Sequence, residues 1–152
     1  MAFIQPCFIR KNTPELRKKL EELGYEPCHQ MTIQPELYKN ISVCNFFGDR
    51  YYGVTDIDCD IADAIKNRGM IDCETNEDLF LALAALRDDS VENQWFIATD
   101  TLWDENYNGE ITTYFEKGQW LKYEDSSYIE DLPSYFRKAT IEDIVMHFQI
   151  QN

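Results

Sequence analysis

Residues Asn76 to Arg87 read NEDLFLALAALR, and this stretch decides the fold. Residues 79–86 are all apolar, so a helix built from them has no polar face. A helix in water tolerates this only where neighbouring elements cover it on every side. Thr75 stands where a helix N-cap accepts from a free backbone N–H, and the acids Glu77 and Asp78 suit the positive helix end. The sequence therefore predicts a central core helix.

Two further helices are predicted by the same pattern, a Thr at the N-cap followed by an acid in the first turn. The first follows Thr13, carries leucines at helical spacing and stops at Gly24. The second follows Thr140 and places apolar residues at i, i+3, i+4 and i+7, namely Ile141, Ile144, Val145 and Phe148. A shorter helix is predicted from Ile61 to Arg68, before Gly69.

Strand-like runs occupy most of the remaining chain. Ile41–Phe46 and Tyr51–Thr55 are joined by Gly48-Asp49 and predict a hairpin. An edge strand is predicted over Phe3–Ile9, since Pro6 disfavours the centre of a sheet. A β-meander is predicted from three more runs, Gln94–Thr99, Glu110–Glu116 and Gln119–Tyr123, with turns at Asn108-Gly109 and Lys117-Gly118.

Runs of strands without strict βαβ alternation favour an α+β fold. We expect an antiparallel sheet packed by three to four helices in a single compact domain, residues 1–152. A chain of this length buries roughly two-thirds of its unfolded surface, which is enough for a real core.

The charge is strongly acidic, with 28 Asp and Glu against 14 Lys and Arg and a formal net charge of −14. Nucleic-acid binding over a broad surface needs clustered basic residues, so direct nucleic-acid binding is not expected. Aromatic residues make up 14% of the chain, which argues against a disordered acidic tail. The sequence predicts a folded acidic protein.

Five cysteines are widely spaced and form no C-x-x-C pair. An odd number without a signal-like N-terminus or a long apolar run favours free thiols in the core of a cytoplasmic protein that does not enter a membrane.

Three segments, Thr13–Tyr25, Asn76–Asp89 and Phe136–Val145, resemble parts of small, uncharacterised acidic proteins of gut bacteria and their tailed phages. The resemblance implies a phage or mobile-element origin. It implies no activity, and it carries no functional residue onto this chain.

No catalytic or metal motif is complete. Residues 104–111, DENYNGEI, match the opening of a calcium loop, but position twelve is Phe115, which offers no carboxylate. An Asn-Gly hairpin turn explains the same residues. The alternating acids of Asp56–Asp60 lack the loop glycine, and Cys28-His29 has no second ligand pair for zinc. The sequence predicts no metal, no cofactor and no enzyme.

Aromatic residues are concentrated in the predicted β-meander. Strand alternation predicts that Trp95 and Ile97 enter the core while Phe96 points away. The remaining aromatic rings could stack on a planar ligand whose phosphates are held by arginines. The candidate ligand-binding residues are Arg50, Arg87, Arg137, Trp95, Trp103, Tyr114 and Trp120.

These features favour a non-enzymatic binding protein of phage or mobile-element type. One hypothesis is sequestration of a small molecule, such as a cyclic nucleotide that serves as a host immune signal. The alternative is an acidic interaction module that occupies a basic surface of a host nucleic-acid-binding protein. An enzyme of unrecognised type remains the third alternative.

Overall fold

A computed structural model describes residues 5–28, 34–46, 49–55, 69–87, 91–125 and 127–149. The chain divides into two compact units, which are described separately. Unit 1 comprises Met1–Asp89 and Ile141–Asn152, and unit 2 comprises Ser90–Thr140. The α+β class is confirmed, although the strands of the described residues form three sheets where the sequence predicts one.

Unit 1 is built on a five-stranded sheet of order β2-β4-β3-β1-β5. The strands are β1 (Cys7–Ile9), β2 (Glu26–Pro27), β3 (Asn40–Phe46), β4 (Asp49–Thr55) and β5 (Ile71–Asp72). The predicted hairpin is confirmed by the antiparallel pair β3–β4. The sheet is mixed, because β1 runs parallel to β5 and β2 runs parallel to β4.

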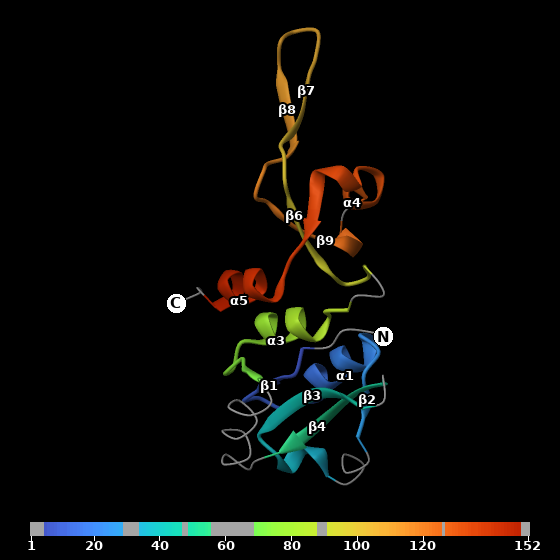
Figure 1. Ribbon diagram of the computed structural model, residues 1–152, viewed down its shortest axis with the longest axis vertical. Coiled ribbons are helices and arrows are strands. Elements are labelled where there is room, and N and C mark those ends of the chain that lie inside the picture. Colours follow the sequence, from blue (N-terminus) through green and yellow to red (C-terminus); the bar gives the residue numbers. More distant parts are fainter. Residues whose placement is uncertain are drawn as a thin grey trace. The chain divides into compact units, whose positions relative to one another are not determined.

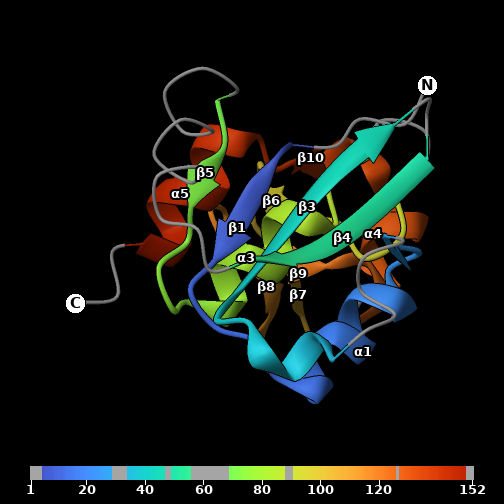
Figure 2. The same ribbon diagram turned by 90° about the horizontal axis from the view of Figure 1, so that it is seen from below.

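The described α-helices of unit 1 are α1 (Pro14–Glu22) and α3 (Glu77–Ala84), which contact the sheet, and α5 (Ile141–Gln149), which packs on α3. α3 contacts β1, α1 and α5 (Figure 1). Seen from below, the strands β1, β3 and β4 lie in front of α3 (Figure 2). Being covered by both the sheet and α5 explains why α3 is apolar all round, with Phe80 and Leu83 completely buried. The prediction of a central core helix is confirmed.

The structure tests two of the three predicted helix caps, confirming that of α1 and correcting that of α3. Thr13 caps α1 by accepting from Leu16 N at 3.1 Å, and Gly24 follows the helix with a φ of 98°. The predicted cap Thr75 is wrong, because the N-cap of α3 is Asn76, whose Oδ1 accepts from Leu79 N. The Nδ2 of the same Asn76 amide donates to the Phe148 carbonyl of α5 at 2.8 Å, so this side chain both caps α3 and bonds to α5.

The prediction that the N-terminal strand is an edge strand is also wrong. β1 lies between β3 and β5 and is fully buried. Pro6 precedes the strand and uses only its carbonyl, which accepts from Ile71 N at 3.1 Å. Its missing N–H therefore costs no ladder bond. The predicted helix 61–68 lies outside the described residues.

Unit 2 contains a three-stranded antiparallel sheet of order β10-β6-β9. The strands are β6 (Trp95–Ala98), β9 (Trp120–Lys122) and β10 (Phe136–Lys138), and the short helix α4 (Tyr128–Asp131) adds Ile129 to the core of the unit. The core consists of Ala98, Phe115, Ile129 and Phe136. Phe96 packs against this core, which corrects the prediction that it points away.

A separate two-stranded sheet completes unit 2. Its strands are β7 (Leu102–Glu105) and β8 (Ile111–Phe115), which among the described strands pair only with each other. The turn at Asn108-Gly109 is confirmed, since Gly109 has a φ of 79° and donates to the Asn106 carbonyl. The sequence did not predict β7, because Asp and Glu have low strand propensity.

Candidate functional site

The β7–β8 hairpin is the most exposed part of the described chain. Every residue from 103 to 114 is exposed, on both faces of the ribbon and at its tip. Within unit 2 the ribbon extends beyond β6, β9 and α4 (Figure 1). Four of its exposed residues are large and hydrophobic: Trp103, Tyr107, Ile111 and Tyr114. Large exposed apolar groups that lie together are typical of interaction surfaces.

The two faces of this ribbon differ in polarity. Trp103 pairs with Thr113, and Glu105 pairs with Ile111, so these four side chains share one face. Trp103 and Ile111 are diagonal neighbours on it, a spacing within reach of an indole ring. The other face carries the directly paired Asp104 and Thr112. Each face therefore carries one carboxylate and at least one threonine, and the first face adds the large apolar side chains of Trp103 and Ile111.

A β-bulge fixes the base of the hairpin. Leu102 pairs with Phe115 and Trp103 with Thr113, which leaves Tyr114 as the extra residue on β8. The rings of Tyr114 and Phe115 both contact Tyr128, with centroid distances of 6.0 and 5.5 Å. Phe115 is itself buried in the core of unit 2. The exposed ribbon therefore continues directly from a packed core.

The tip of the hairpin is held by one side chain. Asn106 Oδ1 accepts from the backbone N–H groups of Asn108 at 2.9 Å and Glu110 at 3.0 Å. Its Nδ2 donates to Glu110 Oε2 at 3.2 Å. These bonds confirm the hairpin turn that the sequence predicts at Asn108-Gly109. They also define the conformation of the loop that carries the fully exposed Tyr107.

A second group of candidate residues lies on the sheet of unit 2. Ile97 pairs with Trp120 on one side and with Arg137 on the other, so these three share a face. Trp95 lies on the same face, with its ring centroid 6.3 Å from that of Trp120 and a tilt of 59°. The structure thus brings together Trp95, Trp120 and Arg137 of the seven predicted site residues.

Arg50 has a structural role in place of the predicted ligand contact. Its side chain is buried, with Nη1 donating to the Leu23 carbonyl at 2.8 Å and Nη2 to the Ala84 carbonyl. The guanidinium also lies 4.4 Å from the centroid of the Tyr25 ring. Both carbonyls belong to helix C-termini, where a cation is favourable. Arg50 therefore joins the ends of α1 and α3 and, at 7% exposure, presents little surface to a phosphate.

The remaining predicted residues are divided between the units. Arg87 is half-buried just after α3 in unit 1, whereas Trp103 and Tyr114 lie on the hairpin of unit 2. The seven residues therefore do not form one cluster within either unit.

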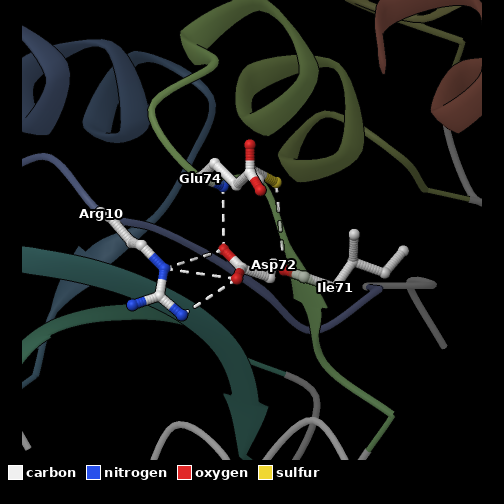
Figure 3. A network of polar contacts seen from close by, with 5 residues as sticks. Arg10, Ile71, Asp72 and Glu74 are labelled. Atoms are coloured by element: carbon white, nitrogen blue, oxygen red, sulfur yellow. Dashed lines mark hydrogen bonds and ion pairs between the residues drawn. The ribbon is translucent and has the colours of Figure 1, made fainter. Parts of the chain in front are cut away.

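A polar network links β1 and β5 in unit 1 (Figure 3). Arg10 Nη2 contacts Asp72 Oδ2 at 3.0 Å, and Asp72 Oδ1 accepts from Glu74 N at 2.9 Å. The Arg10 side chain is 43% exposed, so solvent screens this ion pair and its contribution to stability is small. The network closes the turn before α3 and shows no reactive arrangement.

The neighbouring cysteines also show no activation. Cys7 and Cys73 are free and buried, which confirms for these two the prediction of thiols that fill the core. Burial raises the pKa of the Cys7 thiol, and a hydrogen bond with Cys73 raises it further. A thiol with a raised pKa is a poor nucleophile at neutral pH. Cys59, His29 and the side chain of Cys44 lie outside the described residues.

Within the described ranges, no three His, Cys, Asp or Glu residues are grouped closely enough to hold a metal ion. The acidic run Asp56–Asp60 lies outside those ranges. None of the described helices is both long and apolar enough to cross a membrane.

No family model, no curated protein and no solved structure matches this chain. A functional proposal for the protein therefore depends on its own geometry and charge.

Two exposed residues of the hairpin, Tyr107 and Ile111, were not among the predicted site residues. The turn motif Asn108-Gly109 was a usable signal, because a tight turn at this point exposes the residues on either side of it. Their exposure depends on the β7–β8 pair being separate from the three-stranded sheet, which sequence periodicity does not reveal.

Proposed function

We propose that the protein is a non-enzymatic, acidic interaction module whose β7–β8 hairpin docks on a basic surface of a partner protein. One observation carries this proposal, namely a two-stranded ribbon whose residues 103–114 are all exposed and include Trp103 and Ile111. Isolated two-stranded ribbons are marginally stable in water, and aromatic side chains are enriched at interfaces. A partner surface would cover the apolar groups of the ribbon.

The charge of the hairpin selects the chemistry of the partner. Residues 103–114 contain Asp104, Glu105 and Glu110 and no Lys, Arg or His. The chain as a whole carries −14, which steers it towards positive surfaces and away from nucleic acid. Proteins that bind nucleic acid have extended basic surfaces, and they are the class of partner proposed here.

Charge reversal on the hairpin tests the proposal. We expect Asp104→Lys with Glu105→Lys to slow association with the basic partner about tenfold or more at low salt. The control is Glu22→Lys with Glu26→Lys, an equal charge change at exposed residues of unit 1. Association rates are measured on a biosensor with each protein that the wild type captures from a lysate of its source cells.

The same purified partners are then assayed for nucleic-acid binding with and without the acidic protein. If both double variants slow association equally, the hairpin is not the docking surface. Captured partners without a basic surface would contradict the proposed function itself.

A second candidate function is sequestration of a small planar anion, such as a cyclic nucleotide that acts as a host immune signal. It is favoured by Trp95, Trp120 and Arg137 sharing one face of the unit 2 sheet. Indole rings stack on bases, and a guanidinium binds phosphate through paired hydrogen bonds.

Calorimetric titration with cyclic nucleotides tests this second candidate. We expect stoichiometric binding that Trp120→Ala and Arg137→Ala each weaken about tenfold, and recovery of chemically intact nucleotide after denaturation. Trp103→Ala, on the hairpin, is the matched aromatic control. Heat signals indistinguishable from buffer for every nucleotide would eliminate this candidate, and an altered nucleotide would indicate an enzyme.

A further inference from the structure

The two faces of the hairpin offer different surfaces to a partner. Trp103 is 54% exposed and Ile111 is 66% exposed, and these residues are diagonal neighbours on one face. Asp104 and Thr112 occupy the opposite face. Burying either face desolvates a carboxylate and a threonine hydroxyl, but burying the first also removes the large apolar surface of Trp103 and Ile111 from water. The two faces are therefore not equivalent for docking.

We propose that the Trp103–Ile111 face of the hairpin is the anchor of the interaction and inserts into an apolar groove rimmed by Lys or Arg on the partner protein. This inference rests on the proposed function and specifies which surface makes the contact. Trp is among the residue types most enriched at the few interface positions that contribute most of the binding free energy. Such positions are surrounded by neighbouring residues that exclude water. Ile111 supplies one such neighbour from the paired strand.

The ribbon is ordered before it binds. At its base, Phe115 is buried and packs against Phe136 at a centroid distance of 4.7 Å. At its tip, Asn106 bonds to the backbone of Asn108 and Glu110. Ordering an interface on binding opposes association, so an ordered ribbon loses less conformational entropy. This organisation favours docking of the ribbon as a preformed element.

The basic character of the rim of the partner's groove is inferred from the acidic residues beside Trp103 and Ile111. Glu105 is paired with Ile111 on the same face, so a carboxylate lies at the edge of the apolar surface. A basic side chain on the partner would meet it there, and electrostatic complementarity gives such contacts their specificity. A second copy of this chain is a poor occupant, because each copy carries a formal charge of −14.

A displayed library of random peptides provides a test that does not require the partner to be identified. Peptides are selected on the immobilised wild-type protein, and their dissociation constants are measured by fluorescence anisotropy. We expect selected peptides to combine aliphatic or aromatic residues with Lys or Arg. Trp103→Ala should weaken their binding by about 30-fold or more, the loss expected of a dominant anchor.

Two variants control for position and folding. Thr112→Ala lies on the opposite face at a similar height of the ribbon and should change affinity by less than about threefold. Trp103→Phe keeps an aromatic ring and should retain most of the affinity. Thermal unfolding followed by circular dichroism checks that each variant is folded, which we expect because position 103 is exposed.

The outcomes separate the two proposals. Peptides rich in Lys and Arg whose binding is unchanged by Trp103→Ala would overturn the anchor and leave the acidic interaction module standing. Equal losses from Trp103→Ala and Thr112→Ala would also overturn the choice of face. Peptides without basic residues, or no selection above background, would overturn both proposals.

Discussion

Replacing Leu83 with Asp is expected to abolish the cooperative unfolding transition of unit 1. Leu83 is completely buried in α3, which packs against β1, α1 and α5. An unpaired carboxylate at this position lowers the free energy of unfolding by several kcal/mol. The loss arises either because a charge is buried without a partner or because the carboxyl group must be kept protonated. This cost is comparable to the whole stability of a domain. Denaturant unfolding followed by circular dichroism measures the effect.

The control for this prediction is the same substitution at an exposed leucine. Leu37 lies in the short 3-10 helix Pro35–Leu37 and is 66% exposed, so Leu37→Asp should change the free energy of unfolding by about 0.5 kcal/mol or less. Similar unfolding curves for Leu83→Asp and Leu37→Asp would contradict the central position of α3.

The helices were predictable because their signals are local. The cap at Thr13, the glycine at position 24 and the apolar run in α3 each act through residues within a few positions of one another. The correct cap of α3 was not predictable, since Thr75 and Asn76 both suit an N-cap. Asn76 also bonds to the Phe148 carbonyl, a contact between distant parts of the chain that local sequence does not reveal.

The arrangement of strands was less predictable than their existence. The position of β1 inside the sheet depends on pairing with both β3 and β5, the second of which begins at Ile71. The face of Phe96 likewise depends on where Phe115 and Phe136 pack. Alternation along a strand separates the two faces but does not identify which one is buried.

The candidate site shows the same limit. Trp103 and Tyr114 were identified by type, and both are exposed on the hairpin. The sequence suggests Arg50 as a phosphate ligand because it lies between the two strands of the predicted hairpin, but its position on β4 directs it to carbonyls of two helices. Composition indicates which side chains can bind an anion, whereas tertiary packing decides which of them are satisfied internally.

Loss of the Arg50 side chain is the second large effect that we expect. Arg50→Ala removes hydrogen bonds from a charged donor to the Leu23 and Ala84 carbonyls and the contact with the Tyr25 ring. Hydrogen bonds to charged groups contribute about 1.5–3 kcal/mol each, so we expect the free energy of unfolding to fall by about 3–5 kcal/mol. Arg50→Lys keeps the charge without the planar fork and should fall between Arg50→Ala and the wild type.

Lys18→Ala provides the reference for this second prediction, because Lys18 is an exposed cation on α1 and its loss should cost about 0.5 kcal/mol or less. Urea unfolding of the three variants gives the comparison. The Ala84 carbonyl retains its bond from the Tyr25 hydroxyl at 2.8 Å, so the Leu23 carbonyl is the group most affected by the loss of Arg50. Equal stabilities of Arg50→Ala and Lys18→Ala would show that the C-termini of α1 and α3 are held together by packing alone.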